Sequence, residues 1–145
     1  MKTITPFLWF EKDAEEAAKY YVSLFPNSRV TMTSPMMVNF TLDGQDFMAL
    51  NGGPQYKFTP AISMFVSCEN QEEVDRYWEK LSADPESEQC GWCTDKYGLS
   101  WQIIPKQFME LVSDSDPKKS KAVMDAMLKM KKLIVADLQA AHDGK

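Results

Sequence analysis

Histidine and cysteine are scarce in this sequence. His142, close to the C-terminus, is the only histidine among 145 residues, which excludes an interior catalytic arrangement that pairs serine or cysteine with histidine. The three cysteines, Cys68, Cys90 and Cys93, are an odd and sparse set, unlike the disulfide framework of a small secreted domain. We therefore expect a reducing compartment, the cytoplasm.

Long apolar runs and basic stripes are missing as well. No stretch approaches the ~18 uninterrupted apolar residues of a membrane span, and the N-terminus lacks a signal-peptide profile. The net charge of −5, without a Lys/Arg stripe on any segment, argues against a nucleic-acid partner. Hydrophobic residues make up 44% of the chain and aromatic residues 12%, which is enough for the core of one domain. We expect neither a membrane nor a nucleic acid as partner.

Two stretches of the chain begin in the same way. Residues 13–21 and 70–78 each open with a helix N-cap residue, Asp13 or Asn70, and each has a glutamate three positions later. This spacing is a capping box. Apolar residues then follow at helical spacing, so both stretches are predicted to be amphipathic helices.

Strand candidates surround each helix, because short runs rich in aromatic and β-branched residues favour strands. They are residues 5–10, 29–34, 36–42 and 43–50 in the first half, and 62–67, 89–94 and 97–104 in the second. A further strand of the second half would fall in the Glu-rich stretch before residue 89. The sequence thus predicts an α+β fold built from two strand–helix–strand–strand–strand (βαβββ) modules.

Glycine and proline punctuation divides the chain. Module one covers about residues 1–53 and module two about residues 60–105, followed by a helical appendage over residues 106–145. We expect appendage helices at 106–113 and 117–142, the second broken near Leu133. The second of these helices carries an apolar stripe, which we expect to pack against the rest of the fold. The stripe consists of Val123, Met127, Met130 and Ile134.

Several motifs resemble the PhnB-like proteins of the glyoxalase/bleomycin-resistance/dioxygenase superfamily, also called vicinal oxygen chelate. The PhnB-like proteins are often labelled 3-demethylubiquinone methyltransferase-like. The matching motifs are Thr5-Pro6-Phe7-Leu8-Trp9-Phe10, Phe25-Pro26-Asn27-Ser28, Phe47 to Pro54, Cys90 to Gly98, Ser100-Trp101-Gln102-Ile103 and Met127 to Met130. The resemblance implies a curved mixed sheet in each module, two sheets that close a cup around a small-molecule ligand, and a homodimer.

Metal-dependent members of that superfamily place their ligands on the first and last strand of each module. The matching positions here are Pro6 and Met48 in module one, and Ser63 and Gln102 in module two. Divalent metal enzymes need histidine, aspartate or glutamate at such positions. We therefore expect no metal and no cofactor, which argues against a glyoxalase or a ring-cleaving dioxygenase.

Two other chemistries also fit badly. The Asn51-Gly52-Gly53-Pro54 run follows a strand but does not open a helix, so binding of S-adenosylmethionine, and with it the methyltransferase label, lacks support. Cys90-Gly91-Trp92-Cys93 leads into a turn rather than a helix, which favours a structural or pocket-lining pair over a redox pair.

Strand alternation predicts which residues face the cup. If the four metal-type positions face inward, then so do Leu8, Phe10 and Leu50, whereas Trp9, Phe47 and Trp101 face the helices. Such a lining, mostly apolar with a few polar groups, is typical of a small-molecule pocket. The predicted ligand-binding residues are Leu8, Met48, Leu50, Asn51, Ser63, Phe65, Trp92 and Gln102. No catalytic residue is assigned.

Three functions remain open. The leading hypothesis is a metal-independent protein that holds an apolar or aromatic ligand, in the manner of a drug-sequestering protein. The second is an enzyme of unknown reaction on a small molecule, with Cys90, Cys93 or Gln102 as participants. The third is an interaction protein whose cup has filled in, so that the dimer surface is the functional element.

Overall fold

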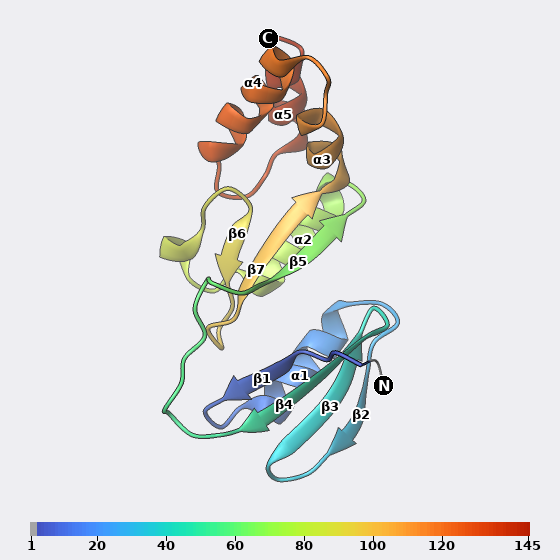
Figure 1. The fold of residues 1–145 in the computed structure, drawn as a ribbon, viewed down its shortest axis with the longest axis vertical. Coiled ribbons are helices and arrows are strands. Elements are labelled where there is room, and N and C mark those ends of the chain that lie inside the picture. The colour runs from blue at the N-terminus through green and yellow to red at the C-terminus, as the bar shows by residue number, and fades with distance from the viewer. Residues whose placement is uncertain (1–2) are drawn as a thin grey trace. The chain divides into compact units, whose positions relative to one another are not determined.

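The computed structural model describes residues 3–145, and the chain divides into two compact units, Met1–Phe58 and Thr59–Lys145 (Figure 1). One four-stranded and one three-stranded sheet, together with the helices, confirm the α+β prediction. Within residues 3–145 no helix is both long enough and apolar enough to cross a membrane.

The first unit is a mixed sheet with one helix. Its elements in chain order are β1 (Phe7–Phe10), α1 (Ala14–Leu24), β2 (Arg29–Thr33), β3 (Met37–Leu42) and β4 (Gln45–Asn51). The strand order is β1-β4-β3-β2, in which β1 runs parallel to β4 and the other pairs are antiparallel. Helix α1 contacts β3, β2 and β4, so one face of the sheet is covered by this helix.

Small and aromatic side chains fill the space between α1 and the sheet. Ala17 and Ala18 are fully buried on the helix, which lets its backbone approach the strands closely. The buried rings of Phe40 and Phe47 lie directly opposite each other on β3 and β4 and stack at 5.3 Å, and Tyr21 packs against Phe40 at 6.4 Å. This cluster is the core of the first unit.

The start of α1 differs from the predicted capping box. Asp13 occupies the N-cap position, but its side chain makes no capping hydrogen bond. Instead, the Oδ1 atom of Asn51 accepts the backbone N–H of Ala14 at 2.9 Å, and its Nδ2 atom donates to the carbonyl of Pro35 at 3.2 Å. The end of β4 therefore caps α1, and Asn51 serves the fold.

The second unit begins with another strand, helix and strands. Its elements are β5 (Ser63–Cys68), α2 (Gln71–Leu81), a 3₁₀ turn η1 (Pro85–Ser87), β6 (Trp92–Thr94) and β7 (Ser100–Pro105). The sheet order is β5-β7-β6, with β5 parallel to β7 and β6 antiparallel to β7. Here the capping box of α2 is confirmed, because Asn70 Oδ1 accepts the N–H of Glu73 at 2.9 Å.

The prediction of four strands in the second module is wrong. The Glu-rich stretch forms η1, because Asp84 accepts the N–H of Glu86 at 3.1 Å and Pro85 occupies the first helical position. The separately predicted strand over residues 89–94 forms in part, because Trp92–Thr94 is β6 and an isolated bridge joins Gln89 to Trp92. The described part of the second unit therefore has a three-stranded sheet.

Three helices complete the second unit: α3 (Lys106–Val112), α4 (Pro117–Leu128) and α5 (Val135–His142). Figure 1 shows them grouped beyond the end of β7. The predicted break near Leu133 is confirmed, since residues 129–134 separate α4 from α5. Met127 and Met130 pack against a buried cluster, which confirms packing as the role of these methionines; the cluster is Ile104, Phe108, Val123, Leu133 and Leu138.

Candidate functional site

Each sheet has a face without a helix, called here its open face. In the first unit the register places Phe7 beside Met48 and Trp9 beside Leu50, and these side chains lie on the open face. Leu8 pairs with the fully buried Ala49, on the opposite face. The open face of the first unit is therefore apolar and partly exposed beside β1, and it becomes polar along β3, where Asn39 pairs with Met48.

The predicted facing of β1 is wrong by one residue. Leu8 and Phe10 are only 6% and 4% exposed and lie on the helix-covered face, whereas Trp9 lies on the open face, because side chains alternate along a strand. Leu8 is consequently part of the core, while the predicted residues Met48 and Leu50 do lie on the open face together with Trp9.

Trp9 is held by the two glycines that follow β4. Its indole Nε1–H donates to the carbonyl of Gly53 at 3.0 Å, and its ring packs edge-on against Tyr56 at 5.0 Å. A Cβ atom on Gly52 would lie 2.3 Å from this indole ring, so glycine is needed there for close approach. Trp9 was predicted to face the helices. The glycine pair that follows β4 is the sequence feature that could have indicated its actual position.

The open face of the second unit brings predicted residues together. Phe65 on β5 and Trp92 on β6 both pair with Gln102 on the central strand β7, so the three side chains form a row across the sheet, here called the aromatic row. Phe65 is 53% exposed, and Trp92 and Gln102 are half-buried. Ser63 and Ser100 pair with each other on the same face.

Gln102 is fixed in one orientation within the aromatic row. Its Nε2 atom donates to the Oγ atom of Ser63 at 2.9 Å. No donor within residues 3–145 is bonded to its Oε1 atom, which therefore presents an acceptor between two aromatic side chains. Such an arrangement can stack a planar ring and accept one hydrogen bond from it.

The side chains at the four superfamily metal positions are poor ligands for a divalent metal. The Pro6 side chain has no atom that can bind a metal, and the Met48 thioether suits soft metals. Ser63 and Gln102 offer only neutral oxygen atoms, and the two side chains are already hydrogen-bonded to each other. Among the described residues, no three His, Cys, Asp or Glu side chains gather in a group that could hold a metal ion.

The thiols are poorly suited to nucleophilic chemistry. Cys93 is buried on β6, and burial, followed by the nearby charges of Asp95 and Glu88, raises its pKa to about 12. Burial also raises the pKa of Cys90 above its ordinary value. The protonated form is the poor nucleophile, so neither cysteine resembles an activated catalytic thiol.

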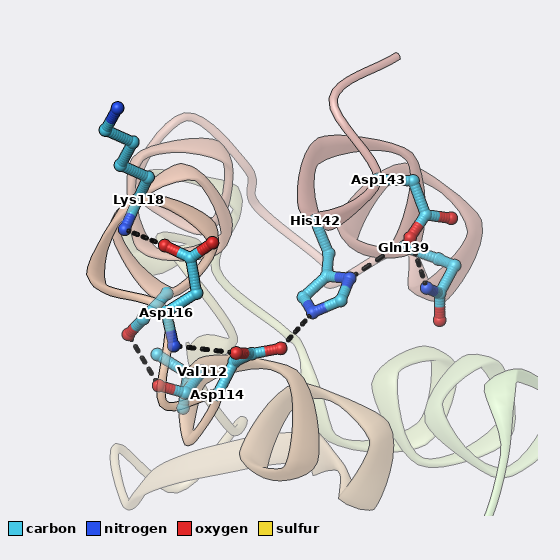
Figure 2. A network of polar contacts seen from close by, with 8 residues as sticks. Val112, Asp114, Asp116, Lys118, Gln139, His142 and Asp143 are labelled. Carbon is cyan, nitrogen blue, oxygen red and sulfur yellow. Dashed lines mark hydrogen bonds and ion pairs between the residues drawn. The ribbon is translucent and has the colours of Figure 1, made fainter.

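The lone histidine joins the end of α5 to the loop between α3 and α4 (Figure 2). The Nε2 atom of His142 lies 2.7 Å from Asp114 Oδ2, in the loop between α3 and α4, and its Nδ1 atom lies 3.1 Å from Asp143 Oδ1. Asp114 also accepts the N–H of Asp116 at 2.8 Å. The hydrogen bond to Asp114 raises the pKa of His142 most, and the bond to Asp143 adds to this shift. The charge of Lys119 acts in the opposite direction and lowers the pKa of His142.

The contact between His142 and its two carboxylates is expected to make stability depend on pH. Because the His142 pKa is raised in the folded state, its stabilisation is complete below about pH 6.5 and is lost as the pH rises through the raised pKa. The lowered pKa values of Asp114 and Asp143 make the contact weaken again in strong acid. The melting temperature of His142→Asn should fall below that of the wild type at about pH 6, and the two should converge by about pH 9.

A gap in melting temperature that stays constant across this range would contradict a titrating contact. Substituting Asp125, which pairs with Lys121 on the exposed side of α4, serves as the control, because that pair has no histidine.

Comparison with known proteins gives one consistent family. The family model described as 3-demethylubiquinone-9 3-methyltransferase matches residues 2–104, so the helices α3 to α5 lie outside it. A solved PhnB protein from Bacillus cereus is 36% identical with a TM-score of 0.62, and the match covers 72% of this chain and 99% of that chain. No curated protein matches the sequence.

One more distant structure shares the fold. A protein from Pseudomonas aeruginosa is 18% identical with a TM-score of 0.59, over 72% of this chain and 98% of that chain. A glyoxylase/bleomycin resistance protein/dioxygenase domain from Frankia sp. EAN1pec is 11% identical with a TM-score of 0.47, over 72% of this chain and 92% of that chain.

Proposed function

The chain belongs to the PhnB-like family of the vicinal oxygen chelate superfamily, and from that premise we propose that it binds a small apolar or aromatic molecule without a metal. The observation that supports this proposal is the aromatic row, in which Phe65 and Trp92 flank the free acceptor of Gln102. Half-exposed aromatic side chains beside one oriented polar group are the usual recognition elements for a planar ligand.

The proposed site lies on the open face of the second unit and keeps four of the eight predicted ligand-binding residues, which are Ser63, Phe65, Trp92 and Gln102. Leu8 is excluded by its burial on the helix-covered face, and Asn51 by its capping role. Met48 and Leu50 lie with Trp9 on the open face of the first unit and are not assigned to this site.

A methyltransferase activity is not proposed, because the family model contributes only its name. The glycine pair after β4 is explained by the Trp9 indole, and no helix begins between Gly52 and Pro60 to bind a cofactor in the usual way.

We propose that the protein works as a homodimer in the cytoplasm, as the resemblance to the family implies.

Replacing Phe65 by alanine is expected to weaken binding of 1,4-naphthoquinone about ten-fold, because one stacking partner is lost. Gln102→Leu should weaken binding of 1-naphthol to a similar extent, because the naphthol O–H can donate to the Gln102 acceptor, whereas 1,4-naphthoquinone has no donor and should be unaffected by this substitution. Binding is measured by quenching of tryptophan fluorescence and by the rise of the melting temperature at saturating probe. Met109→Ala is the matched control, because Met109 is also about half exposed but lies on α3, outside both sheets.

Three outcomes would contradict the proposal. A wild type without saturable binding to any quinone or aromatic antibiotic would favour the interaction protein. Indifference of binding to both Phe65→Ala and Gln102→Leu would place the ligand elsewhere. Stoichiometric zinc, nickel or iron in the purified protein would overturn metal independence.

A further inference from the structure

A β-bulge interrupts the edge of the sheet in the first unit. Val30 on β2 pairs with Phe40 on β3, and Met32 pairs with Asn39, so Thr31 is an extra residue without a partner. A bulge bends its strand and redirects side chains, and bulges are over-represented beside functional sites. The bulge therefore marks this edge of the first sheet for closer inspection.

A pocket of about 180 Å³ lies beside this bulge, wholly within the first unit. It is lined by Thr31, Asn39, Phe40, Asp46 and Phe47 and is called here the bulge pocket. Phe40 and Phe47 also belong to the core of the first unit, where their rings stack. The volume suits a few water molecules or one small polar group.

Two acceptors of the bulge pocket have no hydrogen-bond donor among residues 3–145. The Oδ1 atom of Asn39 is buried and has no hydrogen-bond partner within residues 3–145. No described residue donates to the Asp46 carboxylate or pairs with it, although the Asp46 backbone carbonyl accepts from Gln45. Because native proteins rarely leave a buried acceptor unpaired, such a group calls for a bound donor.

We propose that the bulge pocket binds a primary ammonium group, a function separate from the aromatic row. An ammonium carries three N–H donors and one positive charge, which match the Asn39 oxygen, the Asp46 carboxylate and the Thr31 hydroxyl. A divalent metal fits less well, because calcium takes six or more oxygen ligands and this pocket offers one carboxylate. The ligand class is therefore a small primary amine in its protonated form.

The test is a titration of the full chain with ethylammonium chloride at constant ionic strength, followed by amide chemical shifts in NMR spectra. Saturable shifts are expected at Thr31, Asn39 and Asp46. Tetramethylammonium, which has the charge but no N–H donor, should produce none of them. Saturation by both cations alike would overturn the proposal, as would the absence of saturation by ethylammonium.

Asp46→Asn is expected to weaken ethylammonium binding about ten-fold or more, because a charge-assisted hydrogen bond is lost. Asp43→Asn is the matched control: it removes the same charge three positions away, in the turn between β3 and β4. Asp43 has a φ of 48°, which asparagine tolerates. An equal loss in both variants would show general electrostatic attraction and would overturn the site.

Asn39→Leu provides a second, independent readout. It should abolish ethylammonium binding without lowering the melting temperature, since it removes a buried acceptor that has no partner within the described residues. Retained binding in Asn39→Leu would overturn the role of this residue. Naphthoquinone binding at the aromatic row is measured on the same samples, so failure of one site is distinguished from failure of the other.

Discussion

Replacing Asp95 by alanine is expected to lower the free energy of unfolding by about 3 to 5 kcal/mol. Asp95 is 4% exposed and lies in the turn between β6 and β7. Its Oδ1 atom accepts the backbone N–H groups of Tyr97 at 2.8 Å and Leu99 at 3.1 Å, and its Oδ2 atom accepts the indole N–H of Trp101 at 2.8 Å. Alanine would leave these donors without an acceptor in a region that water scarcely reaches.

Asp95→Asn separates the hydrogen bonds from the shape of the side chain. A carboxamide has one acceptor oxygen, so it can satisfy the two backbone donors or the Trp101 indole, but not both. We expect Asp95→Asn to lower the free energy of unfolding by about 1 to 3 kcal/mol, less than Asp95→Ala does. Urea unfolding followed by tryptophan fluorescence measures both variants.

Asp125→Ala is the control for Asp95, because the Asp125 carboxylate is exposed and forms a surface ion pair with Lys121. An exposed ion pair contributes about 0 to 1 kcal/mol. If Asp95→Ala destabilised the protein no more than Asp125→Ala, the Asp95 carboxylate would not be the organiser of the β6–β7 turn.

The sequence pattern predicted the helices well because their signals are local. Asn70 and Glu73 lie within one turn of α2 and bond to backbone groups beside them. The cap of α1 could not be found in this way, since Asn51 and Ala14 are 37 positions apart in the sequence. Long-range caps depend on the sheet that brings their partners together.

The facing of a strand is predictable only where polar residues alternate with apolar ones. On β5, Ser63 and Ser67 alternate with Met64 and Val66, and Ser63 and Phe65 lie on the open face. β1 is Phe-Leu-Trp-Phe, with a large apolar residue at every position, so alternation carries no information there. Only the parallel register with β4 decides that Trp9, not Leu8, faces outward.

The bulge pocket was missed for a similar reason. Asn39 and Thr41 alternate with apolar residues on β3, which marks one polar face. The position of the extra residue Thr31 on β2 depends on pairing with β3 and leaves no trace in local composition. A buried acceptor without a donor can be recognised only once the neighbouring strands are in place.

The segment between α4 and α5 joins the appendage to the rest of the second unit. Gln71 at the start of α2 donates from Nε2 to the Leu133 carbonyl at 3.0 Å and accepts the N–H of Val135 at 2.7 Å. The backbone N–H groups of Cys90 and Gly91 donate to the carbonyls of Met130 and Lys131 at 2.7 and 2.8 Å. Although α3 to α5 lie outside the matched family model, these bonds make them part of one folded unit.

Leu133→Ala is therefore expected to lower the free energy of unfolding by about 2 to 5 kcal/mol, since Leu133 is fully buried in the cluster that holds α3, α4 and α5. Circular dichroism and tryptophan fluorescence should still report one coincident transition in urea for the second unit. Leu128→Ala is the matched control, because Leu128 is 55% exposed on α4 and should cost less than about 1 kcal/mol. A helical transition that precedes the change in fluorescence would instead show that the appendage unfolds on its own, and that the bonds of Gln71, Cys90 and Gly91 do not couple it to the sheet.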